Sequence, residues 1–210
     1  RPPAVFSAGW AGVDLFFVLS GFLITRILLA SRNRPAYFRT FYARRVLRIF
    51  PLYYGVLVFL FVILAETHLR NTLAYERLRH NQTWYWLYGV NWLLALRGSS
   101  ATPLNTSHFW SLAIEEQFYL LWPFLVYRLQ RRTLVRLCLL IVCVSPLLRL
   151  ALRLAGVDAV AIFAMTPTRL DGLMIGAILA MSDKQSLARS MPAAGLIGFV
   201  SYVGLALWRR

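Results

Sequence analysis

Long apolar runs dominate this chain of 210 residues. Two of them, "GVDLFFVLSGFLITRILLA" (12–30) and "IFPLYYGVLVFLFVILA" (49–65), approach the roughly 20 apolar residues with which a helix crosses a bilayer. Hydrophobic residues make up 59% of the chain, more than in a typical soluble domain. The runs do not alternate between polar and apolar residues as the strands of a membrane barrel do. We therefore predict an all-α, polytopic bundle of transmembrane helices.

Seven apolar segments can be distinguished along the chain. They span residues 12–30, 49–65, 84–96, 108–129, 134–154, 160–181 and 192–208. Segment 84–96 is short and contains Asn91, so it either spans, re-enters or lies in the interface. Pro51 is expected in the first turn of its helix, where its missing N–H costs nothing. No internal repeat or flexible linker divides the chain, which predicts one membrane domain over residues 1–210.

Two basic stretches carry the information on orientation. Residues 31–48 hold six arginines and no acidic residue, and residues 127–136 are also rich in arginine. Arginine-rich loops mark the cytoplasmic side, so both stretches are expected there. Three spanning segments between them would place them on opposite sides, and this conflict leaves the orientation open. The net charge of +15 is distributed among the apolar runs, which favours lipid contact over nucleic acid.

The segment "HFWSLAIEEQFYLLWP" (108–123) contains two adjacent carboxylates. On a helix, His108, Ser111 and Glu115 share one face, while Glu116 points about a quarter-turn away. An ionised carboxylate in the middle of a bilayer costs about 3 kcal/mol on the insertion scale. Glu115 is therefore expected to face a polar cavity, to pair with an arginine or to be protonated. The alternative is that the helix begins at the interface and both acids lie in headgroup water.

The first apolar segment also carries polar and small residues. Asp14 and Gly21 lie on one helical face, and Thr25 follows one turn later. The pair Ser20-Gly21 lets either a ligand or another helix approach closely. Both interpretations are open.

Arginines precede the second apolar segment in "FYARRVLRIFPLYY". Arg45 and Arg48 lie one turn apart on the same face. Planar guanidinium groups suit phosphate oxygens, although anchoring at the cytoplasmic surface explains the same residues without a ligand. Either arginine is also a candidate partner for Glu115.

In the sixth segment, Gly172 and Gly176 form a GxxxG pattern that predicts close helix packing. Arg169 and Asp171 are two residues apart and do not face each other on a helix, so we expect their partners on other elements.

Sequence motifs of other reaction classes are absent from this chain. It has no G-x-S-x-G elbow, P-loop or HExxH motif. Cys138 and Cys143 are spaced for neither a disulfide framework nor a metal site, and we predict no metal. His68 and His80 are expected in solvent. Charged residues within apolar segments fit a transporter and a membrane enzyme equally well.

Four stretches together resemble one family: the integral membrane acyltransferases of acyltransferase family 3, which includes O-antigen acetylase-like proteins. They are "GVDLFFVLSGFLIT", "FYARRVLRIFPLYY", "HFWSLAIEEQFYLLWP" and "RLDGLMIGAILA". The resemblance implies a bundle of about ten helices in the bacterial cytoplasmic membrane. It implies transfer of an acyl group, usually acetyl, from acyl-CoA as co-substrate to a hydroxyl of a surface carbohydrate or glycoside, with no bound cofactor. A transporter or lipid-flipping module would not explain the four stretches together.

The resemblance also implies roles for individual residues. Glu115 is expected to orient the catalytic base or to hold an arginine. His108 is an alternative base on a different ground, because it shares a helical face with Glu115. Arg45 and Arg48 are expected to contact CoA phosphates. Asp14, Gly172 and Gly176 are expected to be structural, with Asp14 at a helix start. The remaining candidates for substrate binding are Ser20, Gly21, Phe22, Trp110, Ser111, Tyr119, Arg169 and Asp171.

One feature departs from the family pattern. The family's catalytic histidine lies in a helix that precedes "GVDLFFVLSGF", and residues 1–11, "RPPAVFSAGWA", contain no match to it. The chain is therefore expected to be an internal fragment, truncated at both ends and inactive by itself.

Overall fold

The computed structural model describes residues 5–104 and 106–182. Within these ranges all regular structure is helical and there is no strand, as the apolar patterning predicts. The α-helices are α1 (Val5–Ser31), α2 (Tyr37–Val58), α3 (Leu73–His80), α4 (Gln82–Trp86), α5 (Val90–Arg97), α6 (Phe109–Arg128), α7 (Arg131–Leu154), α8 (Ala159–Ala164) and α9 (Leu170–Met181). A π-helical turn (Phe59–Ile63) and 3-10 turns at Leu64–Glu66, His68–Asn71, Ser99–Ala101, Thr106–His108 and Thr166–Thr168 complete them.

Three helical stretches in the described residues are long and apolar enough to cross a membrane: Gly12–Ser31, Tyr37–Glu66 and Arg131–Leu154. Helix α6 runs alongside them with 20 residues, but its two glutamates and Gln117 lower its hydropathy. Large apolar side chains point outward from these helices, among them Leu52, Leu121 and Leu147. Outward leucines of this kind are expected where a bundle faces lipid.

The prediction of about seven apolar segments is not confirmed. Segment 84–96 is divided between α4 and α5, and Tyr88 between them has a positive φ of 52°. Helix α5 has eight residues and is therefore about 12 Å long, too short for a hydrocarbon core of about 30 Å. Segment 160–181 is likewise divided between α8 and α9. Segment 192–208 lies outside the described residues.

Helix α2 begins earlier than its apolar run. It starts at Tyr37, after Ala36 in the left-handed conformation with φ 58°, and continues through the π-helical turn to Glu66. Pro51 therefore lies in the helix interior, and the prediction that it occupies the first turn is wrong. The apolar run located the membrane segment, whereas the helix also includes the arginine-rich stretch before it.

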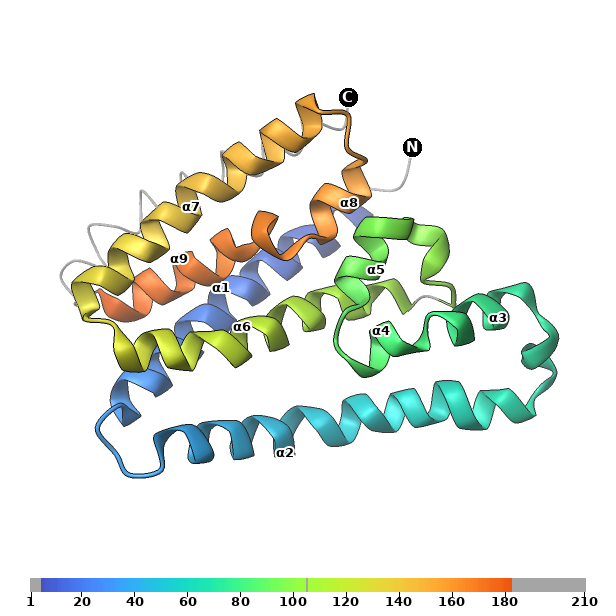
Figure 1. Cartoon of the computed structure of the whole chain (residues 1–210), viewed down its shortest axis with the longest axis horizontal. Helices are drawn as coiled ribbons and strands as arrows, with labels where there is room; N and C mark the ends of the chain where they lie inside the picture. Colours follow the sequence, from blue (N-terminus) through green and yellow to red (C-terminus); the bar gives the residue numbers. More distant parts are fainter. Residues whose placement is uncertain (1–4, 105, 183–210) are drawn as a thin grey trace.

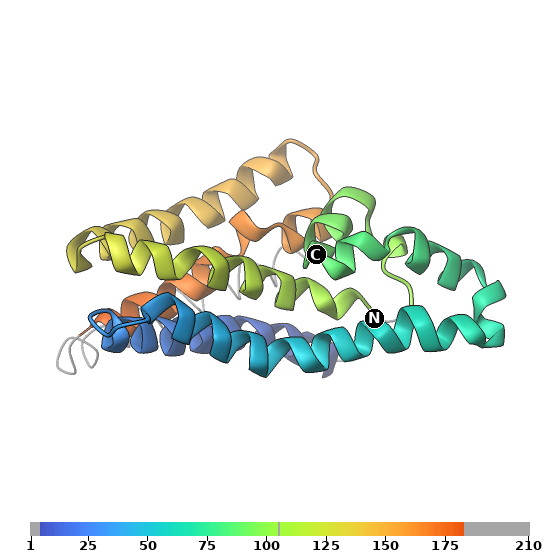
Figure 2. The same ribbon diagram turned by 60° about the horizontal axis from the view of Figure 1, so that its bottom comes forward.

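The two basic stretches lie at the same end of the molecule, which we call the basic end. The loop between α1 and α2 and the junction between α6 and α7 both lie on the left in Figure 1. Helices α3, α4 and α5 lie at the opposite end, on the right in Figures 1 and 2. Only α2 and α6 run between the two basic stretches, because segment 84–96 does not cross. Both basic stretches can therefore lie on the same side of a membrane.

Close contact between α1 and α9 depends on two glycines. A Cβ at Gly21 would overlap the carbonyl oxygen of Leu173, and one at Gly176 would overlap that of Val18. At Gly172 an added Cβ would lie 3.1 Å from the Cβ of Phe17. The GxxxG prediction is confirmed, and Gly21 serves as a notch for helix packing.

A buried polar network ties the short helices to the long ones. Asn91 on α5 is fully buried and donates to the hydroxyl of Thr166 at 2.9 Å. Gln117 on α6 donates to the Asn91 carbonyl at 3.0 Å and accepts from Thr166 at 2.6 Å. These bonds satisfy amide groups that would otherwise be buried without partners.

Candidate active site

Helices α1, α2 and α6 bring five polar side chains together in the interior. They are Ser20, Arg45, Glu115, Glu116 and Tyr119, and we call them the Glu115 cluster. Counted along their helices from the basic end, Ser20, Arg45 and Glu115 lie about 17, 12 and 20 Å deep. The cluster thus lies about two to four helical turns from the basic end, in the interior of the bundle.

Glu115 is the most deeply buried member of this cluster. Its residue is 2% exposed, and the Ser20 and Tyr119 hydroxyls lie close enough to interact with its carboxylate. These two hydroxyls also form a hydrogen bond with each other. The Oε1 atom of Glu115 is buried without a hydrogen-bond partner. The interpretation that Glu115 lies in headgroup water is therefore wrong, and one carboxylate oxygen is available to a further group.

Arg45 is the positive charge of the cluster. Its guanidinium carbon lies 5.5 Å from the centre of the Tyr119 ring and 5.8 Å from that of Phe41. It interacts through its charge with both Glu115 and Glu116, although no direct ion pair joins it to either one. The sequence left Arg45 and Arg48 equivalent as partners of Glu115. The structure selects Arg45, which is half-buried, whereas Arg48 is exposed.

Glu116 also belongs to the cluster, which the sequence did not predict. Its carboxylate interacts electrostatically with Arg45 on one side and with Tyr53, Tyr54 and Tyr88 on the other. Its Oε1 atom is buried without a hydrogen-bond partner, as in Glu115. A quarter-turn on α6 thus directs Glu116 towards α2 and the aromatic residues, not towards lipid.

Arg169 lies in a second polar site, in contact with α1, α6 and α8. It is 4% exposed and forms an ion pair with Asp14 across the α1–α9 contact. Its guanidinium carbon lies 4.5 Å from the centre of the Phe163 ring and 5.8 Å from that of Trp110. Helix α1 begins at Val5, so Asp14 is an interior residue of this helix, and its predicted place at a helix start is wrong.

Asp171 has a different partner, as its spacing from Arg169 indicated. Its carboxylate accepts from Arg149 on α7 at 2.7 Å, and Arg149 also donates to the carbonyl of Thr168 at 2.9 Å. The pair joins α7 to α9. The sequence placed Arg149 in an apolar segment but gave no sign of its partner.

Three other candidate residues lie outside the Glu115 cluster. His108 precedes α6, is exposed and stacks on Phe109 with ring centres 4.7 Å apart. Ser111 donates to the His108 carbonyl at 3.2 Å, as a residue of the first helical turn. Two turns of helix, about 10 Å, separate His108 from Glu115. Phe22 is half-buried, and the Arg26 guanidinium carbon lies 5.9 Å from the centre of its ring.

The Glu115 cluster can accept or orient a proton, and it can stabilise a negative charge. A carboxylate oxygen without a partner can orient or accept a proton, and a nearby guanidinium can stabilise a negative oxygen or sulfur atom. Among the described residues, no three His, Cys, Asp or Glu side chains are grouped as metal ligands.

Comparison with known proteins places this chain among acyl-transferring proteins. Residues 4–208 match the model of a family described as an acyltransferase domain. The chain is 36% identical over 193 residues to the Bacillus subtilis protein named "Putative peptidoglycan O-acetyltransferase YrhL", which covers 83% of this chain and 29% of that protein. It is 32% identical over 186 residues to O-acetyltransferase OatA of Staphylococcus aureus, covering 83% of this chain and 30% of OatA.

Peptidoglycan O-acetyltransferase OatA of Listeria monocytogenes is similar to the same degree, with 32% identity over 184 residues, 82% of this chain and 29% of the relative. The chain therefore spans less than a third of the length of these curated relatives. No solved structure matches it.

Proposed function

Because this chain belongs to the acyltransferase family whose model matches residues 4–208, we propose that it forms part of an O-acyltransferase of the bacterial cytoplasmic membrane. The enzyme would transfer an acetyl group from acetyl-CoA to a hydroxyl of a cell-surface carbohydrate. Peptidoglycan is the first acceptor to test, because the names of two relatives specify it.

The observation that carries this proposal is the Glu115 cluster. Two carboxylates, each with one buried oxygen lacking a partner, lie beside a half-buried arginine in the interior of the bundle. Ionisable groups in that position are costly and are retained where they line a substrate or proton path. A purely structural role would be expected to leave these oxygens hydrogen-bonded.

The basic end would face the cytoplasm, where acetyl-CoA is found. Arg48 lies one turn beyond Arg45 and is exposed, as are Val46, Leu47 and Arg44. Exposed guanidinium groups at the cytoplasmic end of a helix are suited to an anionic partner. A phosphate group of CoA, held by the planar guanidinium group of Arg48, would supply one, whereas Arg45 lies within the Glu115 cluster.

In the transfer step, the acceptor hydroxyl oxygen bonds to the thioester carbonyl carbon while its proton passes to a general base. The carbon–sulfur bond then breaks, and the CoA thiolate leaves and takes up a proton. The resemblance implies a histidine N-terminal to residue 12 as that base, with Glu115 as its positioning residue. Arg45 is placed to stabilise the negative charge that develops. His108, exposed and two turns from Glu115, is the less suitable base.

The test is transfer of labelled acetyl from acetyl-CoA to peptidoglycan, using membranes that contain the complete gene product. We expect Glu115→Gln to lower the rate at least about 100-fold. Arg48→Ala should raise KM for acetyl-CoA. His108→Ala should retain the rate, as should Glu66→Gln, a matched acid in the 3-10 turn Leu64–Glu66 and outside the cluster. Unchanged transfer in Glu115→Gln would contradict the site. Uptake or flipping without acetylation in the wild type would favour a transporter.

A further inference from the structure

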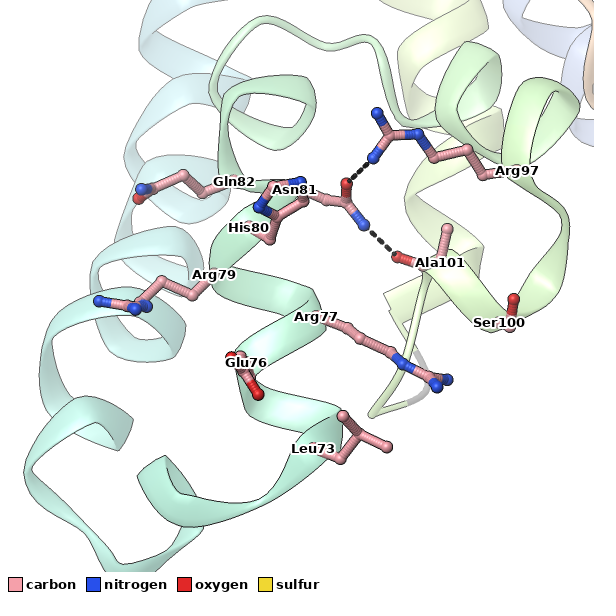
Figure 3. Close-up of a pocket in the computed structure, with 10 residues that line it drawn as sticks. All are labelled: Leu73, Glu76, Arg77, Arg79, His80, Asn81, Gln82, Arg97, Ser100 and Ala101. Atoms are coloured by element: carbon pink, nitrogen blue, oxygen red, sulfur yellow. Dashed lines mark hydrogen bonds between the residues drawn. The ribbon is translucent and has the colours of Figure 1, made fainter.

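A pocket of about 710 Å³ lies at the end of the molecule opposite the basic end. It is formed by α3, the start of α4, the end of α5 and the 3-10 turn that follows (Figure 3). Its lining residues are Leu73, Glu76, Arg77, Arg79, His80, Asn81, Gln82, Arg97, Ser100 and Ala101. The volume is within the range of sites for small ligands.

Positive charge predominates in this pocket. Three arginines and one acid, Glu76, line it, and in the described part of the chain no carboxylate forms an ion pair with any of these arginines. Arginines at the basic end are explained by the positive-inside rule. The rule gives no reason for the arginines at the opposite end. Their presence there calls for another explanation.

Asn81 holds one of these arginines in place. It is 5% exposed, its Nδ2 group donates to the carbonyl of Ala101 at 3.2 Å, and its Oδ1 atom accepts from Arg97 at 2.7 Å. Figure 3 shows Arg97 reaching across to Asn81 and Arg77 extending towards the Ser100 side, while Arg79 extends to the other side of α3. Arg97 is thus held in position by a neutral amide and not by a carboxylate.

We propose that this pocket binds carboxylate groups of the carbohydrate acceptor, one at Arg97 and another at Arg77. The inference rests on the proposed function, which places the acceptor outside the cytoplasm. Peptide-bearing glycans of the cell wall carry free carboxylates, and the guanidinium fork binds two carboxylate oxygens at once. A lipid would also need an apolar surface for its acyl chains, whereas Leu73 and Ala101 are the only apolar residues among those that line the pocket.

The test measures binding to the complete protein in phosphatidylcholine nanodiscs. The probe is a disaccharide-peptide of N-acetylglucosamine and N-acetylmuramic acid, and chitotetraose is the neutral comparison. Arg97→Gln and Arg77→Gln should each weaken binding of the disaccharide-peptide about tenfold, the effect of losing one charge-assisted hydrogen bond. Arg97→Lys should lose less. Arg153→Gln, on α7 outside the pocket, is the matched control and should bind as the wild type does.

Added salt should weaken binding of the disaccharide-peptide and leave chitotetraose unaffected. Equal binding of both probes by wild type and Arg97→Gln would overturn the proposal. So would arginine-dependent binding of dioctanoyl-phosphatidylglycerol with no binding of the disaccharide-peptide, because the pocket would then hold a lipid headgroup.

Acetyl transfer separates the two hypotheses. If wild type transfers acetyl and the pocket variants bind normally, only the pocket proposal fails. If the variants lose binding and wild type transfers nothing, only the proposed function fails.

Discussion

Replacing Gly176 by alanine tests the packing that positions α1. The added Cβ would overlap the Val18 carbonyl oxygen and lie 2.6 Å from the backbone nitrogen of Phe22. Both neighbours are backbone atoms of α1 and cannot turn aside as a side chain can. The two helices must therefore separate by about 1 Å, a gap that forfeits a quarter to a half of each affected dispersion contact. We expect Gly176→Ala to lower the free energy of unfolding by about 3 kcal/mol, the upper part of the range for overpacked cores.

Gly55→Ala is the matched control. Gly55 lies in the interior of α2, and an added Cβ there would meet no atom within 4 Å. Alanine is the better helix former by about 0.5–1 kcal/mol, so this variant should be as stable as the wild type or slightly more stable. Unfolding of both variants in mixed detergent and dodecyl sulfate gives the two free energies. Equal stability of Gly176→Ala and the wild type would refute the close contact between α1 and α9.

Three further outcomes follow from the contacts. Trp122→Phe should lower the free energy of unfolding by about 1 kcal/mol, because the indole N–H donates to Thr25 at 2.8 Å; no change in thermal unfolding would contradict that bond. Asn91→Leu should lower the free energy of unfolding by about 2–4 kcal/mol, since position 91 is fully buried and Gln117 and Thr166 would each lose a partner there. Stability equal to wild type would show that this network does not stabilise the fold. In a variant without Cys138 and Cys143, an impermeant thiol reagent applied to intact cells should label Ser100→Cys and not Arg34→Cys, and the reverse pattern would invert the proposed orientation.

Local patterns in the sequence predicted the elements whose signal is contained in one segment. The apolar runs located α1, α2 and α7, because burial in lipid demands length and apolarity from each helix separately. The small residues of α9 predicted close packing, and Gly176 fulfils this at the backbone of α1. The breaks within segments 84–96 and 160–181 were less visible, since both halves remain apolar and the interruption depends on contacts with other helices.

The site was only partly predictable because its contacts join distant positions. Helical spacing could place Glu115 on a face, but it could not show that this face meets Ser20 and Arg45. For the same reason, the sequence did not distinguish Arg45 from Arg48 as the partner of Glu115. Helical spacing alone also placed Glu116 away from the site. The sequence contains both charges of the Arg169–Asp14 ion pair, but it does not show that the two residues are in contact. The spacing rule did predict that Arg169 and Asp171 have different partners.

The central claim is that Arg45 and Glu115 act together, and a double-mutant cycle on acetyl transfer tests it most directly. The kcat/KM of wild type, Arg45→Gln, Glu115→Gln and the double variant would be compared, with Arg48→Gln replacing Arg45→Gln in a parallel cycle. Groups that act as a unit give strongly non-additive losses. We expect the double variant to be no slower than Glu115→Gln alone, and the Arg48 cycle to be close to additive. Losses that multiply in the Arg45 cycle would mean that the two side chains work independently, contrary to the site described above.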